Sequence, residues 1–316
     1  MRTYWRQRND LVRAAGRHIQ RIHKALTQMN IQLANVLSDV SGMTGQAIIH
    51  TILAGERDPH KLAAFRDFRV KASEEQIARS LEGHWQEDLL FVLKQEQDGY
   101  EFCQKQMLEC DRQVEQYLQQ REDRSKGAPL PEEKRKGRLK KKKGNAPQFN
   151  LRGELFRMSG ADLTQIDSID VMTATTILSE VGWDISKWET EDHFVSWLRL
   201  CPDNRISGAK IIGKGRLPTK NRVSIALKMA ASTLWRSNTY LGAQFRRLRT
   251  KLGAPIAIKA MAARLARLVY RMLRYGMKYV DQGAEFYEAQ HRNLQIKHLK
   301  WKAAKLGFQV VAAPAT

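Results

Sequence analysis

The chain has 316 residues, enough for one large or two modest domains, and it carries a formal net charge of +21. This charge makes nucleic acid the leading candidate partner, with an anionic membrane surface as the alternative. No apolar run reaches the roughly 18 residues that span a bilayer, and the basic start at Arg2 is not a secretion signal. We therefore expect a cytoplasmic protein without a membrane partner. Its three cysteines form no CxxC pair, which argues against a zinc site.

The first 120 residues are predicted to form two long helices joined by a compact helical tip. Apolar residues recur at spacings of three and four over residues 9–37 and again over about 86–120, as in the seam of a coiled coil. Between them, Asp58-Pro59 predicts the start of a short helix, and the capping box from Ser73 to Gln76 predicts another. The long helices would pair as a hairpin within one chain, or with a second subunit to give a homo-oligomer.

The composition changes over residues 121–147, where glycine and proline interrupt a run with little apolar content. Such a segment buries too little surface to offset its chain entropy, so it is predicted to be a disordered linker. A lysine run in it would release counterions on meeting a phosphate backbone. Binding of nucleic acid and simple solvation are the two interpretations of this run. Its candidate contacts are Lys140, Lys141, Lys142 and Lys143.

Residues 148–316 are predicted to form a second, mainly helical domain. Residues 162–182 have the layout of a helix-hairpin-helix, whose backbone amides grip a DNA phosphate. Farther on, a predicted helix over 256–280 places five cations on one face. Like charges stacked in this way need a counter-charge, and we favour a nucleic-acid backbone over an acidic protein surface. These cations are Arg264, Arg267, Arg271, Arg274 and Lys278.

The stretch from Trp197 to Ala231 places Ser207 beside a glycine in a predicted loop crowded with cations. A hydroxyl nucleophile amid fixed positive charge suits attack on phosphate, because cations hold the polyanion and stabilise charge on the transferring phosphoryl group. An ordinary serine in a basic loop is the alternative. A helix is predicted from near Asn221 through Leu234. The cations of the loop are Arg205, Lys210, Lys214, Arg216, Lys220 and Arg222.

This stretch resembles the core motif of bacterial insertion-sequence transposases of the 110/116/902 group, in which an aliphatic-Gly-Leu-x-Pro segment leads to Ser-Gly-Gly-Lys. Matching residues are Leu198, Leu200, Pro202, Ser207, Gly208 and Lys210, followed by Asn221-Arg222. The departures are Arg199, Ile206 and Ala209. By resemblance, Ser207 is the catalytic nucleophile that joins covalently to DNA. Where the family has Gly-Ile-Gly at its hairpin, this chain has Ser168 and Asp170 in place of the glycines, so we expect a degenerate helix-hairpin-helix that packs structurally.

The resemblance covers nearly the whole chain, including residues 53–63 and 246–270, and implies a mainly α protein: a long coiled-coil helical hairpin plus a C-terminal helical transposase domain. Relatives begin with a RuvC-like domain whose acidic tetrad binds Mg²⁺. We find no such segment here, so the chain is expected to be the C-terminal portion of a recombinase, inactive by itself. No cofactor is expected in this chain and none of its carboxylates is nominated as a metal ligand.

DNA and a structured guide RNA are the partners that the resemblance implies. A non-catalytic basic module that scaffolds nucleic acid or inhibits the full-length transposase is the main alternative. A decayed gene product without a role is a third possibility.

Overall fold

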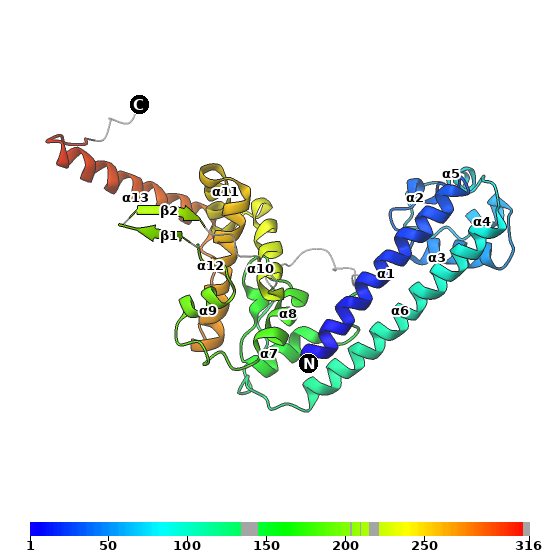
Figure 1. Ribbon diagram of the computed structural model, residues 1–316, viewed down its shortest axis with the longest axis horizontal. Helices are drawn as coiled ribbons and strands as arrows, with labels where there is room; N and C mark the ends of the chain where they lie inside the picture. Colours follow the sequence, from blue (N-terminus) through cyan, green and yellow to red (C-terminus); the bar gives the residue numbers. More distant parts are fainter. Residues whose placement is uncertain (134–144, 203, 209, 215–220, 312–316) are drawn as a thin grey trace. The chain divides into compact units, whose positions relative to one another are not determined.

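The computed structural model describes residues 1–133, 145–202, 204–208, 210–214 and 221–311. The chain divides into two compact units, Met1–Gln116 with Pro147–Phe149 and Tyr117–Ala146 with Asn150–Thr316. Both units are built from helices, and a two-stranded hairpin is the only sheet in the part of the chain that is described (Figure 1). The predicted mainly α fold class is therefore confirmed.

The first unit is built on two long antiparallel helices, α1 (Arg2–Gln28) and α6 (Glu87–Gln119), which lie side by side in Figure 1. Arg8 of α1 pairs with Asp111 of α6, whereas His18, farther along α1, pairs with Glu96, nearer the start of α6. The order of these pairs shows that the helices run in opposite directions. The two helices therefore form a hairpin within one chain, while coiled-coil packing and pairing with a second subunit stay predictions.

The predicted single helix over residues 9–37 is wrong in its bounds. Helix α1 begins at Arg2 and ends at Gln28, and only the short α2 (Leu33–Val36) follows. Asn30 takes a left-handed backbone conformation with φ 60°, which an α-helix does not continue. The apolar spacing persists across this break because Ile31 and Leu33 are buried in the same core as the end of α1.

The tip of the first unit consists of short helices around an aliphatic core. They are α3 (Met43–Leu53), α4 (Pro59–Ala63) and α5 (Glu74–Ser80). The predicted helix starts are confirmed: the Asp58 carboxylate accepts from the His60 amide, and Ser73 and Gln76 bond reciprocally to each other's backbone. Fully buried members of this core include Ile22, Met29, Leu33, Ile48, Ile49, Ile52, Leu62, Ile77 and Leu93.

The second unit is centred on α12, which packs against α9, α10 and α11. Alanines along α12, such as Ala257, Ala262 and Ala266, are completely buried and let the neighbouring helices approach closely. The elements of this unit are α7 (Leu151–Ser159), a 3₁₀ turn η1 (Leu163–Gln165), α8 (Val171–Val181), α9 (Glu191–Trp197), β1 (Asn204–Ser207), β2 (Lys210–Lys214), α10 (Arg222–Thr233), η2 (Leu234–Arg236), α11 (Tyr240–Leu252), α12 (Ala254–Tyr275) and α13 (Gly283–Lys305).

Helix α12 ends earlier than predicted. Gly276 adopts a left-handed C-cap with φ 62° and its amide donates to the Met272 carbonyl, which closes the helix after Tyr275. Lys278 therefore lies outside α12 and does not continue the row of arginines, so its assignment to the shared helix face is wrong. Gly253, with φ 82°, forms the junction between α11 and α12.

Candidate functional site

Ser207 lies at the turn of a β-hairpin where a loop is predicted. Strand β1 pairs antiparallel with β2, so that Ser207 is opposite Lys210. Gly208 has φ 54°, the left-handed conformation that glycine adopts without steric cost in a tight two-residue turn. Ser207 is exposed. The residue is therefore not buried among apolar side chains, which would have ruled out attack on a polynucleotide.

The sequence contains a signal for this hairpin. Ile206, Ile211 and Ile212 are β-branched residues on either side of the glycine turn, a pattern typical of short paired strands. The many lysines and arginines around these residues instead favoured the prediction of a loop. The register is irregular between Arg205 and Ile206, where a bulge shifts the pairing.

The predicted cations of this region are only partly placed. Arg205, Lys210 and Lys214 are located by their backbone in the two strands, and Arg222 is the partly buried first residue of α10. Arg216 and Lys220 lie outside the described residues, as do Lys140, Lys141, Lys142 and Lys143. The hairpin thus brings Ser207 and Lys210 together across one turn.

Both ends of the hairpin segment are anchored in the second unit. Leu198 and Leu200 are completely or almost completely buried before it. After it, the Asn221 side chain accepts from the amides of Val223 and Ser224 and starts α10, as predicted. Arg199, between the two leucines, has φ 55°. This left-handed conformation explains why a glycine suits that position of the family motif.

Helix α9, which leads into the hairpin, is held against α12 by ion pairs. Arg271 donates to both carboxylate oxygens of Glu191 at 2.5 and 2.7 Å, and Arg267 donates to Asp192 at 2.8 Å. Phe194 packs edge-on against Trp188, with ring centroids 4.9 Å apart. Hydrogen bonding to Glu191 raises the pKa of the Arg271 guanidinium, which keeps that cation charged.

The counter-charge of two members of the arginine row is therefore an acidic pair within the protein, and contact of the row with nucleic acid stays a prediction. Arg267 and Arg271 are neutralised by an acidic pair on α9, which lies 75 to 80 residues away in the sequence. Sequence reasoning missed these acids because it looked for an acidic run rather than two adjacent carboxylates. Of the others on α12, Arg264 is partly buried and Arg274 is exposed.

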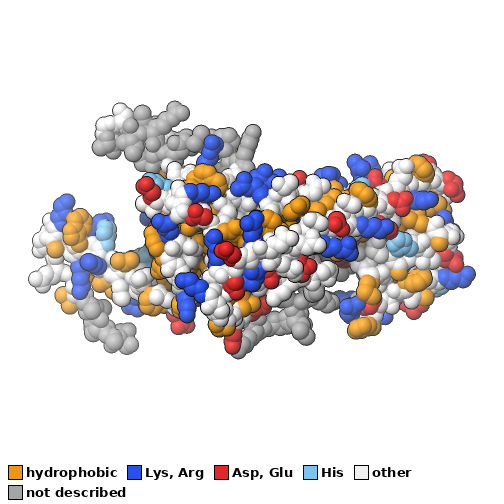
Figure 2. Space-filling view, turned by 90° about the horizontal axis from the view of Figure 1, so that it is seen from below, with side chains coloured by type: hydrophobic (Ala, Val, Ile, Leu, Met, Phe, Trp, Pro, Cys, Tyr) orange, Lys and Arg blue, Asp and Glu red, His pale blue; other side chains and the backbone are white. Residues whose placement is uncertain are grey.

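Charge alone does not single out a binding surface. Figure 2 shows lysine and arginine side chains spread over the visible face among aspartates and glutamates. The distinction that matters is whether a cation already has a carboxylate partner, because a paired cation adds little attraction for phosphate.

Sequence reasoning missed an exposed cluster of tryptophan and arginine between α10 and α11. Trp235 in η2 is 45% exposed, and the guanidinium carbons of Arg236 and Arg249 each lie 5.2 Å from its ring centroid. The sequence signal for this cluster is the Trp235-Arg236 pair followed by the basic run of α11. We refer to Trp235, Arg236 and Arg249 as the Trp235 cluster.

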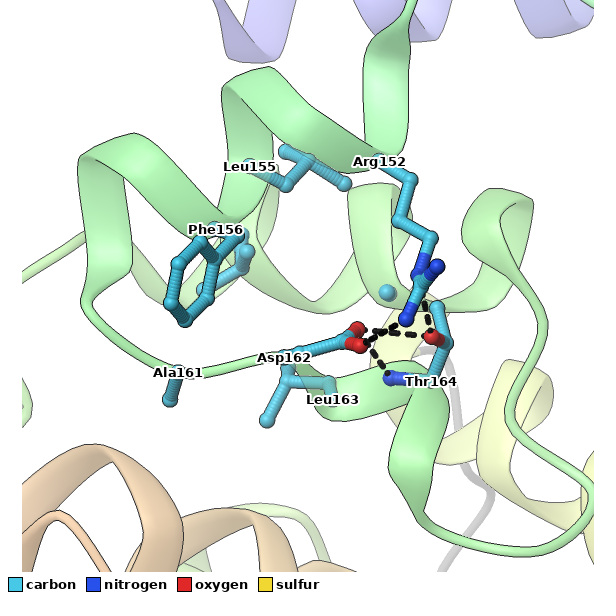
Figure 3. Close-up of a pocket in the computed structure, with 9 residues that line it drawn as sticks. Arg152, Leu155, Phe156, Ala161, Asp162, Leu163 and Thr164 are labelled. Atoms are coloured by element: carbon cyan, nitrogen blue, oxygen red, sulfur yellow. Dashed lines mark hydrogen bonds and ion pairs between the residues drawn. The ribbon is translucent and has the colours of Figure 1, made fainter. Parts of the chain in front are cut away.

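A second polar cluster, drawn in Figure 3, has a structural role. Asp162 is 4% exposed and accepts from the Arg152 guanidinium at 2.5 Å and from Thr164 and Gln165. Burial by itself raises the pKa of the Asp162 carboxyl, but these hydrogen bonds together hold the pKa below its ordinary value. The carboxylate therefore joins η1 to α7.

The predicted degenerate hairpin precedes α8. Ser168 has φ 72°, a conformation that favours glycine, and the Asp170 carboxylate accepts from the Thr173 amide at the start of α8. An aspartate at this position places a negative charge at the N-terminus of α8, where the helix dipole would otherwise attract a phosphate. A purely structural role for this segment stays a prediction, with Asp170 as the group that disfavours a phosphate there.

Among the residues that the structure describes, no three His, Cys, Asp or Glu side chains are grouped so as to hold a metal ion. None of the described helices has both the length and the apolar character needed to cross a bilayer.

Comparison with known protein families finds a match around the serine hairpin. No curated protein matches the chain. Residues 160–246 match the model of the Transposase IS116/IS110/IS902 family. This span contains Ser207, the two strands of its hairpin and Trp235. The match supports a transposase or recombinase role with DNA as the partner, and on this evidence the part of the chain that carries Ser207 is similar to the insertion-sequence transposases of that family.

Proposed function

We propose that the chain is the serine-bearing part of an insertion-sequence transposase and that Ser207 attacks a DNA phosphodiester. The main support is the exposure of Ser207 at a glycine-closed turn inside the matched segment. A serine nucleophile needs an approachable hydroxyl near groups that stabilise developing negative charge. The two strands carry Arg205, Lys210 and Lys214 on either side of that turn.

In the proposed step, the Ser207 Oγ forms a bond to phosphorus while the bond from phosphorus to one deoxyribose oxygen breaks. The hydroxyl proton passes to water or a neighbouring base, and the departing sugar oxygen takes up a proton. The number of phosphoester bonds is unchanged, so the phosphoserine link conserves the energy needed to join the strand to a new end. Arg222 and the strand cations would neutralise the phosphate both when Ser207 attacks and when the strand is joined to its new end.

The partners of this reaction follow from the same proposal. DNA is the substrate, a structured guide RNA selects the site, and pairing of the α1–α6 hairpin between copies gives a homo-oligomer. Magnesium would come from an acidic domain of the kind found in relatives, and no step above depends on where it lies. The chain is therefore expected to bind nucleic acid, and strand joining is expected to need a metal-binding acidic domain.

The experiment is a search for a covalent protein–DNA adduct on the ends of the encoding element, with and without the acidic domain supplied separately. We expect a denaturation-resistant adduct with the supplemented protein and none with Ser207→Ala. Ser232→Ala is a matched control, because that hydroxyl donates to the Met229 carbonyl within α10.

An adduct that persists in Ser207→Ala would contradict the nucleophile assignment. Ser207-dependent joining by the isolated chain would overturn the requirement for an acidic domain. If no adduct forms with or without the acidic domain while nucleic-acid binding is retained, the result would favour a non-catalytic binding module.

A further inference from the structure

The exposed ring of Trp235 lies on a well-fixed backbone. Leu234, its neighbour, is fully buried and the Ser237 amide donates to the Leu234 carbonyl at 2.9 Å. Arg246 of α11 donates to the Ser237 carbonyl at 2.6 Å. A Cβ on Gly242 would overlap that same carbonyl oxygen, so the close approach of α11 to this turn needs glycine. The backbone that carries the indole is thus held in place by the core.

The cations beside Trp235 differ from those on α12. Arg267 and Arg271 are held by carboxylates. For Arg236 and Arg249 the described part of the chain provides no ion pair, and both side chains are exposed. Their contact is with the indole ring, at 5.2 Å for each guanidinium carbon. These positive charges are therefore available to a polyanion.

The free energies of the possible contacts indicate which ligand such a cluster binds best. A cation over an exposed aromatic ring contributes about 0.5–1 kcal/mol. A nucleobase stacked on an aromatic side chain contributes about 1–3 kcal/mol. A base can therefore displace one arginine from the ring, and the released guanidinium gains a phosphate partner. Bases inside a duplex are already stacked and cost a few kcal/mol to extract, so an unpaired base is favoured.

We propose that the Trp235 cluster is a binding site for one unpaired base of a single-stranded nucleic-acid segment, with Trp235 stacking on the base and Arg236 and Arg249 contacting its flanking phosphates. This proposal rests on the proposed function only in taking nucleic acid as the partner. It requires no strand cleavage, so its failure and the failure of the Ser207 proposal are separate results.

The test is fluorescence anisotropy with the full chain and labelled oligonucleotides of about 12 nucleotides, a length within the range of single-strand sites. Single-stranded DNA, single-stranded RNA and an abasic oligomer with the same number of phosphates are compared. Because stacking contributes about 1–3 kcal/mol, Trp235→Ala should weaken binding to the base-bearing oligomers about 5- to 150-fold. Its affinity for the abasic oligomer should stay within about twofold of wild type.

Trp301→Ala is the matched control, because Trp301 on α13 is 60% exposed and its ring contacts are His298, with centroids 6.0 Å apart, and the Lys305 ammonium, 5.6 Å from the centroid. It should retain wild-type affinity for every oligomer. Trp235→Phe keeps a ring and should recover part of the loss. Arg249→Gln should weaken the base-bearing and abasic oligomers alike and lower the salt dependence by about one phosphate contact.

Thermal melting of each variant checks that the fold is retained. Trp235→Ala losses confined to RNA, confined to DNA or shared by both would each support the site and identify its natural ligand. Equal losses on base-bearing and abasic oligomers would overturn stacking. Wild-type affinity in a folded Trp235→Ala protein would overturn the site altogether.

Discussion

The single hydroxyl hydrogen of Tyr270 is shared between the backbone carbonyl oxygens of Trp188, 2.8 Å from the phenol oxygen, and Glu189, 3.0 Å from it. Tyr270 is 1% exposed, and burial raises the pKa of its phenol, which keeps it a neutral donor. The carbonyls belong to the segment just before α9. The C-terminal part of α12 therefore holds the backbone from which the chain proceeds into the Ser207 hairpin.

Tyr270→Phe should loosen α9 because it leaves two carbonyls without their donor while preserving the ring. The expected loss is about 1–3 kcal/mol of local stability. Hydrogen–deuterium exchange over residues 191–197 measures it, with Tyr4→Phe as the control because that side chain is 40% exposed in the first unit. Unchanged exchange would show that aromatic contacts and ion pairs hold α9 without this hydroxyl.

The pair between Arg271 and Glu191 should show measurable coupling in a double-mutant cycle. Its geometry is bidentate, but the side chains are 38% and 25% exposed, so we expect about 1 kcal/mol. The substitutions are Arg271→Gln and Glu191→Gln, separately and together, followed by thermal melting. Zero coupling would mean that solvent screening cancels the pair.

The Arg271→Gln variant also tests whether a cation with a carboxylate partner contributes less to nucleic-acid binding than a cation without one. Arg271→Gln should change nucleic-acid affinity much less than Arg249→Gln, although each removes one positive charge. A larger effect at Arg271 would restore nucleic acid as the counter-charge for the α12 row.

Local signals in the sequence predicted the helix starts and some of the helix ends. Asp58, Ser73 and Asn221 each cap a helix through a side-chain oxygen two or three residues from the amide it accepts from, so a short window suffices. The glycine at 253 likewise marks a break by its own conformational freedom.

Features that depend on tertiary contact could not be predicted from such local signals. Arg271 and Glu191 are 80 residues apart, and no spacing rule connects them. The early end of α1 depends on Asn30 adopting a left-handed conformation while the apolar pattern continues beyond it. Exposure of Trp235 was equally hidden, because a tryptophan among helical residues is most often a core residue.

Asp162→Asn should destabilise the second unit at neutral pH and reduce its sensitivity to acid. Removing one partner of a buried ion pair costs about 3–5 kcal/mol. The lowered pKa of Asp162 means that its contribution is complete above the ordinary carboxyl pKa and disappears as the pH falls through the lowered value. The gap in melting temperature between wild type and variant should therefore narrow below about pH 4.

Thermal melts across this pH range make the measurement. Asp184→Asn is the control, because Asp184 is exposed and also has a lowered pKa, from hydrogen bonds with Ser186. It should change the melting temperature much less than Asp162→Asn does. A gap that widened in acid would contradict an ionised Asp162 in the folded state.

Gly208→Val should disrupt the turn that presents Ser207, whereas Gly208→Asn should preserve much of it. The φ of 54° costs an ordinary L-residue about 1–2 kcal/mol, more for a β-branched one, and asparagine tolerates it best. A penalty of that size lowers the equilibrium ratio of formed to unformed hairpin about 5- to 30-fold. Amide exchange over residues 204–214 should therefore quicken in the valine variant, and adduct formation by Ser207 should fall as the formed hairpin is depopulated. Binding at the Trp235 cluster should be unchanged in both variants, because Trp235 lies on η2 and not on the hairpin. If the valine variant forms adducts at the wild-type rate, the glycine-closed turn does not position the nucleophile.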